Sequence, residues 1–271
     1  MHGLSPSWLR LMRSKEWRLV RRVVEKADVV FEVVDARDPM ATRTRELERL
    51  ASRLGKPLVI VINKADLVPR EVVERWKRVL SKEYPTIYLS ARDRLGTRML
   101  WKAARRAARA KRPVVVAVVG LPNVGKSTII NVLKGRHSAG TSPVPGYTRD
   151  DKLVRAATWL KVVDTPGVVP RGDEEELVIR SALRPESLED PVPAAMKLIE
   201  RLRARDPEAF KRTYGVDDED PYRLLEKIAE RRRLLLKGGR LNVEEAARIV
   251  IRDWQTGKLV VYFTPEDYGI G

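Results

Sequence analysis

The amino-acid sequence predicts an α/β fold with a mostly parallel sheet, followed by a smaller α-helical domain. Up to about residue 164, short apolar runs rich in β-branched residues alternate with amphipathic helical patterns, as is typical of parallel β-α units. Beyond Gly172 the apolar residues recur at helical spacing instead. Pro170, Gly172 and the acidic run at 173–176 separate the two patterns, so we place the domains at residues 1–171 and 172–271.

Each element of the first domain has its own signal. Most expected strands are followed by a helix, which predicts parallel pairing with right-handed crossovers. The expected elements are a helix over residues 8–26, a strand over 29–34 that ends at Asp35, a helix from Thr42 or Thr44 to about 54, a strand over 58–62, a helix over 69–82, a strand over 86–89, a helix over 95–112, a strand over 114–119, a helix through 129–133, and strands over 152–157 and 160–163.

The second domain is expected to be helical. Helices are predicted over residues 194–204, 222–236 and 243–254, and residues 259–263 are expected to form a short strand or a tail. In both domains, tryptophans such as Trp17, Trp76 and Trp254 occupy apolar positions of helical patterns. We therefore expect these indole rings in the cores.

Composition excludes several classes of protein. No apolar run approaches the roughly 18 residues that a membrane helix needs, and the first residues lack the apolar segment of a secretory signal. The absence of cysteine excludes disulfides, zinc–thiolate sites and a thiol nucleophile. We therefore expect a cytoplasmic protein that has no membrane partner. We also expect the protein to be monomeric when free, which does not follow from the composition.

The formal net charge of +17 is unevenly distributed. Residues 1–171 carry a net charge of +20, whereas residues 172–271 carry a net charge of −3. A positive field of this size favours a large polyanion as a partner, and RNA is the polyanion that we expect. A charge-rich, heat-adapted surface is the alternative explanation.

A phosphate-binding loop follows the strand over residues 114–119. The segment from Gly120 to Ser127 matches the pattern GxxxxGK[ST] in full, and a helical pattern follows at once, as this motif requires. Its backbone N–H groups can face a β-phosphate, Lys126 adds a charge near the β- and γ-phosphates, and Ser127 offers an oxygen to Mg²⁺. The expected nucleotide contacts in this loop are Asn123, Val124, Gly125, Lys126, Ser127 and Thr128.

A second motif, Asn63-Lys64-Ala65-Asp66, follows the strand over residues 58–62 and has the guanine-reading pattern NKxD. The carboxylate of Asp66 can accept hydrogen bonds from guanine N1–H and the exocyclic amino group. Adenine offers neither donor, so such a site can reject it by roughly 10⁴–10⁵-fold. Asn63 is expected to hold the loop and Lys64 to cover the face of the base. An ATPase, the alternative, would leave Asp66 without a role.

Three further segments complete the expected site. Ser90-Ala91, at the next strand end, would support guanine through backbone N–H groups. In Asp164-Thr165-Pro166-Gly167, Asp164 would bind Mg²⁺ through water, and the N–H of Gly167 would sense the γ-phosphate. For the Mg²⁺-binding threonine of the first switch we favour Thr148 over Thr141.

The order of these motifs, NKAD, SAR, GLPNVGKS, PGYT and DTPG, is a rotation of the usual GTPase order. The chain resembles the circularly permuted GTPases, most closely the YlqF/RbgA-type group that assists assembly of the large ribosomal subunit. Residues 35–39, Asp-Ala-Arg-Asp-Pro, match the DARxP stretch of that group, and the tail around residues 251–253 is similar to its C-terminal helical domain. The resemblance implies a circularly permuted P-loop GTPase domain, GTP or GDP with Mg²⁺ as ligands, and ribosomal RNA or a precursor of the large subunit as partner. The DARxP stretch itself has no assigned role.

Three candidates remain for the group that promotes hydrolysis. Many GTPases place a water-orienting glutamine directly after the DxxG glycine, but this chain has Val168 there, so we expect slow intrinsic turnover. Asn123 could hold a K⁺ ion, as an asparagine does in potassium-activated GTPases; bound RNA could order the switches; or His137 could act at the edge of the first switch. His2 is interpreted as part of a solvated terminus. The other residues expected to support catalysis are Lys126, Thr148 and Gly167.

Two basic patches are candidates for RNA contact. In the helix over residues 95–112 the cations recur at intervals of four and three with no acid among them, which places them along one face where they could follow phosphates. A second cluster lies in the C-terminal domain. An ordinary solvated face is the alternative for both. The candidate residues are Arg98, Lys102, Arg105, Arg109 and Arg112 in the first patch, and Arg231, Arg232 and Arg233 in the second.

These features predict an enzyme that hydrolyses GTP to GDP and phosphate and couples its nucleotide state to RNA binding in large-subunit assembly. Because the permuted chain runs from Gly167 straight into the second domain, movement of residues 168–172 is expected to reorient that domain. The alternative is an RNA-assembly scaffold in which bound guanine nucleotide is structural and turnover is negligible.

Overall fold

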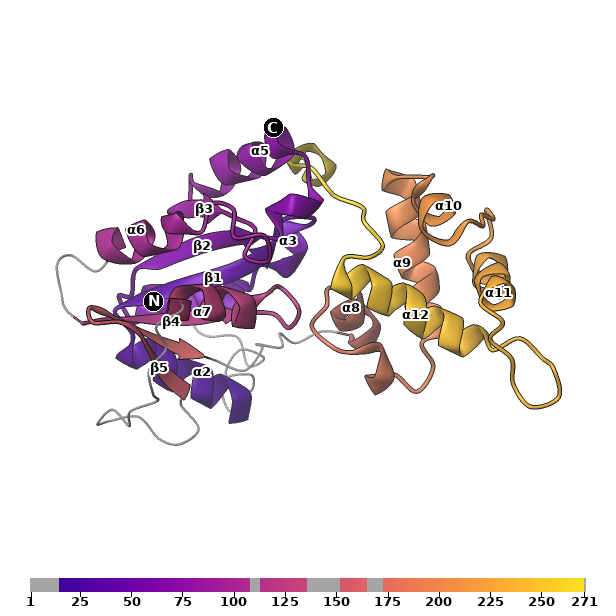
Figure 1. The fold of residues 1–271 in the computed structure, drawn as a ribbon, viewed down its shortest axis with the longest axis horizontal. Helices are drawn as coiled ribbons and strands as arrows, with labels where there is room; N and C mark the ends of the chain where they lie inside the picture. The colour runs from indigo at the N-terminus through magenta and orange to yellow at the C-terminus, as the bar shows by residue number, and fades with distance from the viewer. Residues whose placement is uncertain (1–14, 108–112, 136–151, 165–172, 271) are drawn as a thin grey trace. The chain divides into compact units, whose positions relative to one another are not determined.

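The computed structural model describes residues 15–107, 113–135, 152–164 and 173–270. The chain divides into two compact units, residues 1–170 with 264–271, and residues 171–263 (Figure 1). The chain therefore leaves the first unit, builds the second, and returns to the first for its last eight residues. The division from the sequence had assigned those eight residues to the helical domain, and their contacts correct it.

A six-stranded sheet with the order β3-β2-β1-β4-β6-β5 forms the centre of the first unit (Figure 1). All neighbouring strands are parallel except the β5–β6 pair, which is antiparallel. The predicted α/β class with a mostly parallel sheet is confirmed. The strands are β1 Val29–Asp35, β2 Leu58–Asn63, β3 Thr86–Tyr88, β4 Val114–Gly120, β5 Lys152–Ala157 and β6 Leu160–Asp164.

The register of the strands brings their carboxyl ends together. Asp35 at the end of β1 lies opposite Asn63 at the end of β2. On the other side of β1, Gly120 at the end of β4 lies opposite Val33. The end of β6, Asp164, pairs with Val118 of β4. Motifs that are far apart in the sequence thus meet along one edge of the sheet, where parallel sheets bind ligands.

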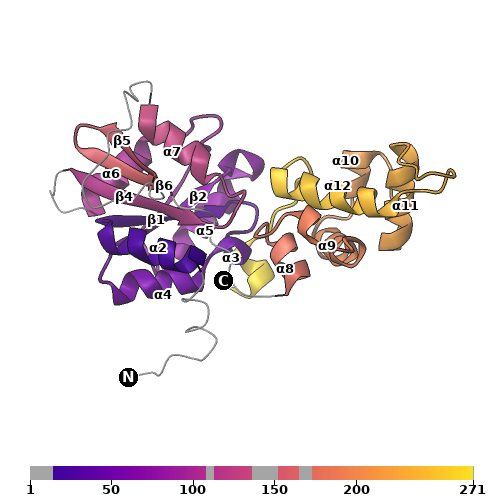
Figure 2. The ribbon, with the colours of Figure 1, turned by 90° about the horizontal axis from the view of Figure 1, so that it is seen from below.

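Helices cover both faces of this sheet. Figure 2 shows α2 and α4 on one side of the sheet and α7 on the other. Trp17 of α2 and Trp76 of α5 are buried, as their positions in the helical patterns predict. The helices of this unit are α2 Lys15–Lys26, α3 Pro39–Thr42, α4 Arg45–Arg53, α5 Arg70–Leu80, α6 Arg98–Ala107 and α7 Lys126–Lys134, with a 3-10 turn η1 at Ala65–Leu67.

Helix α4 has Thr44 as its N-cap, one of the two residues predicted for that position. One short helix was not expected, and one helix starts later than predicted. The short helix α3 precedes α4, because the side chain of Asp38 accepts a hydrogen bond from the backbone N–H of Ala41 and Pro39 suits a first helical position. Helix α6 begins at Arg98 rather than Leu95. Arg94 and Gly96 both have positive φ, at 57° and 71°, which keeps the chain out of the helical conformation until that point.

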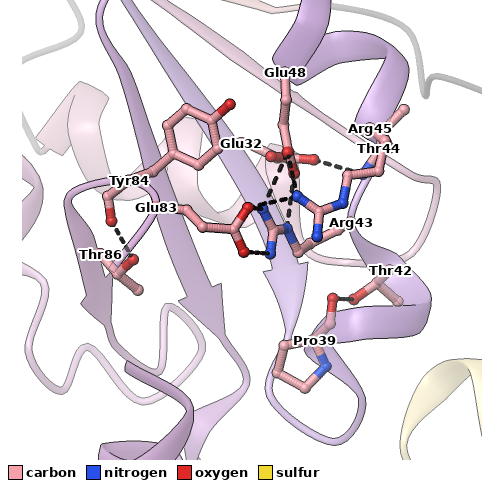
Figure 3. Close-up of polar contacts among 10 residues, drawn as sticks. All are labelled: Glu32, Pro39, Thr42, Arg43, Thr44, Arg45, Glu48, Glu83, Tyr84 and Thr86. Atoms are coloured by element: carbon pink, nitrogen blue, oxygen red, sulfur yellow. Dashed lines mark hydrogen bonds and ion pairs between the residues drawn. The ribbon is translucent and has the colours of Figure 1, made fainter. Parts of the chain in front are cut away.

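An ionic cluster, buried except for Glu83, lies between α4 and the sheet (Figure 3). Arg43 donates to Glu48 at 2.7 and 3.0 Å and to Glu83 at 3.0 and 3.1 Å. Glu32 of β1, which is fully buried, accepts from the N–H of Thr44 at 2.6 Å through one oxygen. Burial, followed by the negative charge of Glu48, raises the pKa of Glu32 well above its ordinary value. We call these four side chains, Glu32, Arg43, Glu48 and Glu83, the Arg43 cluster.

The second unit is a bundle of helices around one apolar core, which includes Phe210 and Trp254. Its helices are α8 Glu174–Ile179, α9 Val192–Arg205, α10 Ala209–Tyr214, α11 Pro221–Arg231 and α12 Val243–Thr256, with a 3-10 turn η3 at Pro185–Ser187. The acidic run at 173–176, expected to mark the boundary, follows directly after the division at residues 170 and 171 and starts α8. Asp173 caps this helix by accepting from the N–H of Glu176, and acidic residues are favourable in a first turn.

The end of α11 was predicted five residues too late. Arg233 has φ of 55°, which ends the helical path, and an isolated β-bridge then pairs Leu235 with Leu241 around Gly238 and Gly239. Within the described part of the second unit, residues 259–263 are not a strand. Among all described residues, no helix is long and apolar enough to cross a membrane.

The C-terminal segment packs on the first unit through the 3-10 turn η4 Pro265–Tyr268. The ring of Tyr268 meets Trp76 edge-on, with the ring centroids 5.9 Å apart. Its hydroxyl donates to a carboxylate oxygen of Asp38 at 2.6 Å. Glu266 forms an ion pair with Arg75. This segment therefore joins α5 to the loop that follows β1.

Candidate nucleotide-binding site

The phosphate loop lies between β4 and α7, where its two glycines meet other elements closely. Gly120 has φ of 154°, and a Cβ there would lie 2.5 Å from the carbonyl oxygen of Val33 in β1. Gly125 has φ of 96°, and a Cβ there would lie 2.2 Å from the amide nitrogen of Asn63. Asn123 is also left-handed, with φ of 61°. Only glycine fits at Gly120 and Gly125, so the backbone can form the tight curve that cradles phosphate.

Lys126 is the first residue of α7 and is 8% exposed. Its ammonium donates to the carbonyl oxygen of Leu121, at the start of the loop, at 2.7 Å. The charge is thus held at the helix N-terminus, which also favours anions. Ser127 and Thr128 follow on the exposed side of the same turn. This is the arrangement expected of a loop that holds the β- and γ-phosphates.

Asn63 ties three motifs together and is almost fully buried. Its amide nitrogen donates to the carbonyl oxygen of Val124 in the phosphate loop at 2.9 Å. Its amide oxygen accepts from the backbone N–H of Ala91, in the Ser-Ala segment, at 3.0 Å. One side chain therefore fixes the phosphate loop, the NKAD loop and the Ser90-Ala91 segment relative to one another.

The carboxylate of Asp66 is engaged by an arginine. The guanidinium of Arg92 donates to Asp66 at 2.6 Å, and the Asp66 side chain is only 11% exposed while that of Arg92 is 71% exposed. A guanidinium presents adjacent N–H groups, as the N1–H and amino group of guanine do. The sequence placed Arg92 in the Ser-Ala-Arg motif but gave no sign of this contact, because it depends on how two loops fold together.

Asp35 of the DARxP stretch contacts the lysine of the NKAD motif. The ammonium of Lys64 lies 2.8 Å from a carboxylate oxygen of Asp35. Arg37 donates two hydrogen bonds to the same carboxylate, at 3.1 and 2.9 Å. Although burial raises it, the charges of Arg37 and Lys64 hold the pKa of Asp35 well below its usual range. Burial lowers the pKa of Lys64, against the pull of Asp35.

Several predicted site residues lie outside the described residues. These are His2, His137, Thr141, Thr148, Gly167 and Val168. For Asp164 the structure gives the backbone position at the end of β6, beside β4 and hence beside the strand that leads into the phosphate loop. The roles of these residues in metal binding and catalysis remain predictions.

The predicted RNA-contact residues occupy two separate units. On α6, Arg98, Lys102 and Arg105 are exposed, and the guanidinium of Arg105 lies 4.4 Å above the ring of Trp159. Arg109 and Arg112 lie outside the described residues. In the second unit Arg231 packs over Gly215, Arg232 pairs with Asp253 at 3.4 Å, and Arg233 is exposed. Two of the three second-unit arginines therefore have contacts within their own unit.

Comparison with known proteins agrees with this geometry. A family model described as "RsgA GTPase" matches residues 7–171, and one described as "50S ribosome-binding GTPase" matches residues 115–231. A GTP-binding protein of Methanocaldococcus jannaschii is 41% identical over 260 residues, which cover 94% of this chain and 69% of that protein. This chain belongs to the circularly permuted GTPases.

Other members resemble this GTPase over most of its length. Nucleolar GTP-binding protein 2 of Neurospora crassa is 34% identical over 263 residues, which cover 92% of this GTPase but only 41% of the fungal protein. The crystal structure of GNP-bound YlqF from T. maritima superposes with a TM-score of 0.67 and 27% identity, covering 93% of this chain and 99% of that one. The predicted circularly permuted GTPase fold is thereby confirmed.

Proposed function

We propose that this protein binds GTP, hydrolyses it to GDP and phosphate, and couples its nucleotide state to RNA contact during assembly of the large ribosomal subunit. The observation that carries the proposal is the Asn63 side chain, which joins the phosphate loop, the guanine-reading loop and the Ser-Ala segment into one site. The match to the family described as 50S ribosome-binding GTPase and the similarity to nucleolar GTP-binding protein 2 of Neurospora crassa support the ribosomal setting.

Within this site the residues divide by ligand group. Asp66 would accept from the guanine edge, Lys64 would cover the base, and the N–H of Ala91 would support it. Lys126 would neutralise the β- and γ-phosphates from its position at the start of α7. Mg²⁺, which prefers oxygen ligands and substrate phosphates, would be held by Ser127, Thr148 and Asp164.

The fit of a triphosphate is supported by the shape of the loop. A Cβ at Gly125 would lie 2.2 Å from the amide nitrogen of Asn63, so glycine there lets the phosphate loop curl tightly against the NKAD loop. When bound, Mg²⁺ neutralises the charge that develops between the β- and γ-phosphates. The chain itself would orient these groups through Lys126 and the N–H of Gly167.

Hydrolysis is proposed to be slow until a partner binds. Val168 stands where many GTPases have a water-orienting glutamine, and a valine side chain cannot orient water. A K⁺ ion at Asn123, ordering of the switch segments by RNA, and His137 are the three candidates for the missing function. The exposed cations of α6 and Arg233 would contact the RNA.

GTP turnover tests this proposal when measured in K⁺ and in Na⁺ buffer, each with and without purified large ribosomal subunits or their precursors. We expect strong stimulation by the particle, and faster turnover in K⁺ if Asn123 holds the ion. The Lys126→Ala variant is the control for contaminating GTPases and should be inactive. Flat, slow turnover in all four conditions would contradict the proposal and favour the scaffold with a structural nucleotide.

A further inference from the structure

The DARxP stretch lies directly beside the base-reading loop. Parallel pairing sets Asp35, the last residue of β1, opposite Asn63, the last residue of β2. The pairing continues past the strands, because the N–H of Ala36 donates to the carbonyl oxygen of Asn63 at 2.8 Å. Lys64 is the next residue along. The position of Asp35 relative to Lys64 is therefore fixed by the sheet.

Lys64 has an unusual conformation for a lysine. Its φ of 61° is left-handed, a region that non-glycine residues rarely occupy, and its side chain is only 17% exposed. A lysine on a loop normally keeps its ammonium in water and its stem mobile. Here the ammonium is 2.8 Å from Asp35 Oδ2, so the stem is held in one direction.

Arg37 fixes the carboxylate that holds Lys64. Its Nε and one Nη donate to the two oxygens of Asp35, and its backbone N–H donates to Oδ1 at 3.0 Å. The side chains of Arg37 and Asp35 are 2% and 6% exposed. A bidentate pair of this kind has little freedom to rotate. The carboxylate therefore offers Lys64 a rigid partner.

We propose that Asp35, held by Arg37, is a positioning residue for guanine binding: it anchors the ammonium of Lys64 so that the lysine stem is already placed over the site of the base. The proposal rests on the proposed function, because it assumes that the NKAD loop binds guanine. Ordering the side chain before the ligand arrives lowers the entropy lost on binding. The DARxP stretch thereby gains a role in nucleotide affinity without touching the nucleotide.

The rival explanation is that the Asp35–Arg37 pair only stabilises the fold. Loss of either carboxylate interaction would then lower stability and leave nucleotide affinity unchanged in the folded protein. The two explanations differ in whether the effect of Asp35 passes through Lys64. A double-mutant cycle measures that dependence directly.

The experiment measures equilibrium binding and dissociation of fluorescent GDP with the full chain, for Asp35→Asn, Lys64→Met and the double variant. We expect about tenfold weaker binding for each single variant, mainly through faster dissociation, and a double variant no weaker than Lys64→Met alone. Glu48→Gln is the matched control: it breaks the buried pair with Arg43, at 1% and 3% exposure, away from the nucleotide site. It should lower the melting temperature and leave GDP binding unchanged.

Two results would overturn the inference: unchanged GDP binding in folded Asp35→Asn, or additive losses in the double variant. Should Asp35→Asn fail to fold, Asp35→Glu keeps the charge but displaces it by one methylene. It should bind GDP more weakly than the wild type and more tightly than Lys64→Met, and wild-type affinity would again contradict the inference. If the wild-type chain binds neither GDP nor GTP, the proposed function fails instead.

Discussion

At the scale of single residues, the site is defined by which hydrogen-bond partner each polar group has. Asn63 has a partner for each end of its amide, and both partners belong to other motifs. Asp66 has Arg92 where guanine would present its N–H groups. Asp35 has two cations. Most of the specificity that we expect depends on these three carboxyl and amide groups.

Replacing Asp66 by asparagine tests base recognition. The amide would present a donor toward the exocyclic amino group of guanine, so GDP binding should weaken by about a hundredfold or more. Xanthine has an oxygen at that position, so XDP should bind to the variant more tightly than it binds to the wild type. Competition between GDP, XDP and ADP gives the answer. An unchanged preference would mean that Asp66 is idle and would favour an ATPase.

Removing the guanidinium of Arg92 tests whether it competes with guanine for Asp66. The pair is exposed on the arginine side, where solvent screens an ion pair, so Arg92 competes only weakly with guanine. Arg92→Ala should therefore bind GDP modestly more tightly, by up to about fivefold, with a faster association rate. Arg94→Ala, a neighbouring exposed cation, is the control. Weaker binding in Arg92→Ala would instead indicate that Arg92 contacts the bound nucleotide.

At the scale of elements, β1 carries two buried acidic residues, Glu32 in its middle and Asp35 at its end. Their surroundings shift the two pKa values in opposite directions, up for Glu32 and down for Asp35. Asp35 is surrounded by cations. One carboxylate oxygen of Glu32 accepts a hydrogen bond from the backbone N–H of Thr44. The other, Oε2, has no hydrogen-bond partner among the described residues. Glu48 lies close enough for its charge to raise the pKa of Glu32 further (Figure 3).

This difference predicts how stability depends on pH. Because the pKa of Glu32 is raised in the folded state, its favourable contribution is present below the unfolded pKa of about 4.5 and is lost as the pH rises toward the folded pKa. Glu32→Gln mimics the protonated form and should lack this decline. Urea unfolding at pH 4.5 and 7.5 measures it. A steeper decline in the variant than in the wild type would contradict the assignment.

Glu83 of the Arg43 cluster is a control, because its pKa is shifted in the opposite direction and its contribution to stability should therefore depend on pH in the opposite way. Hydrogen bonds from Arg43 and Arg45 lower the pKa of Glu83 to about 2, so its contribution is present above pH 4.5 and is lost as the pH falls toward 2. Glu83→Gln should therefore be less stable than the wild type at pH 7.5, with the difference shrinking in acid. The Glu83 side chain is 44% exposed, so we expect a small effect.

At the scale of the whole molecule, the connectivity ties the second unit to the first at both ends. The chain enters the second unit after residue 170, directly behind the DTPG motif, and returns at Thr264. In the returning segment, Tyr268 contacts the ring of Trp76 and donates a hydrogen bond to Asp38. Asp38 belongs to the DARxP stretch, so the stretch that contacts Lys64 through Asp35 also contacts the C-terminal segment through Asp38.

Tyr268→Phe tests this closing contact. Loss of the hydroxyl removes one hydrogen bond to a carboxylate and should lower the free energy of unfolding of the first unit by about 1–2 kcal/mol. Tyr222→Phe, in which an exposed tyrosine of the second unit loses its hydroxyl, is the matched control and should have no effect. Equal stability of Tyr268→Phe and the wild type would show that the contact contributes nothing.

Nucleotide-dependent rearrangement of the two units is the prediction that belongs to the whole chain. Residues 168–172 join the DTPG motif, which we expect to sense the γ-phosphate, to the second unit, so switching between GDP and GTP should change the small-angle scattering profile. Profiles with GDP and with a non-hydrolysable GTP analogue, each with and without RNA, test this. Identical profiles in all conditions would exclude coupling through this connection.

The sequence by itself determined the features that depend on residues close together in the chain, namely the secondary-structure elements and the contiguous motifs. Alternating apolar strands and amphipathic helices predicted the parallel sheet, and the contiguous motifs at Gly120–Ser127 and Asn63–Asp66 predicted a guanine-nucleotide site at the strand ends. Each signal is local because a phosphate loop or a strand needs its residues in a fixed spacing along the chain.

Only the tertiary structure decided which distant residues meet. Asp35 reaches Lys64, Arg92 reaches Asp66, and Tyr268 reaches Asp38 across 230 positions of sequence. It also assigned residues 264–271 to the first unit. Such contacts leave no periodic pattern, because they arise from strand order and from how loops pack at the edge of the sheet. The physical reason is that register and packing, rather than local propensity, fix the distance between residues far apart in the chain.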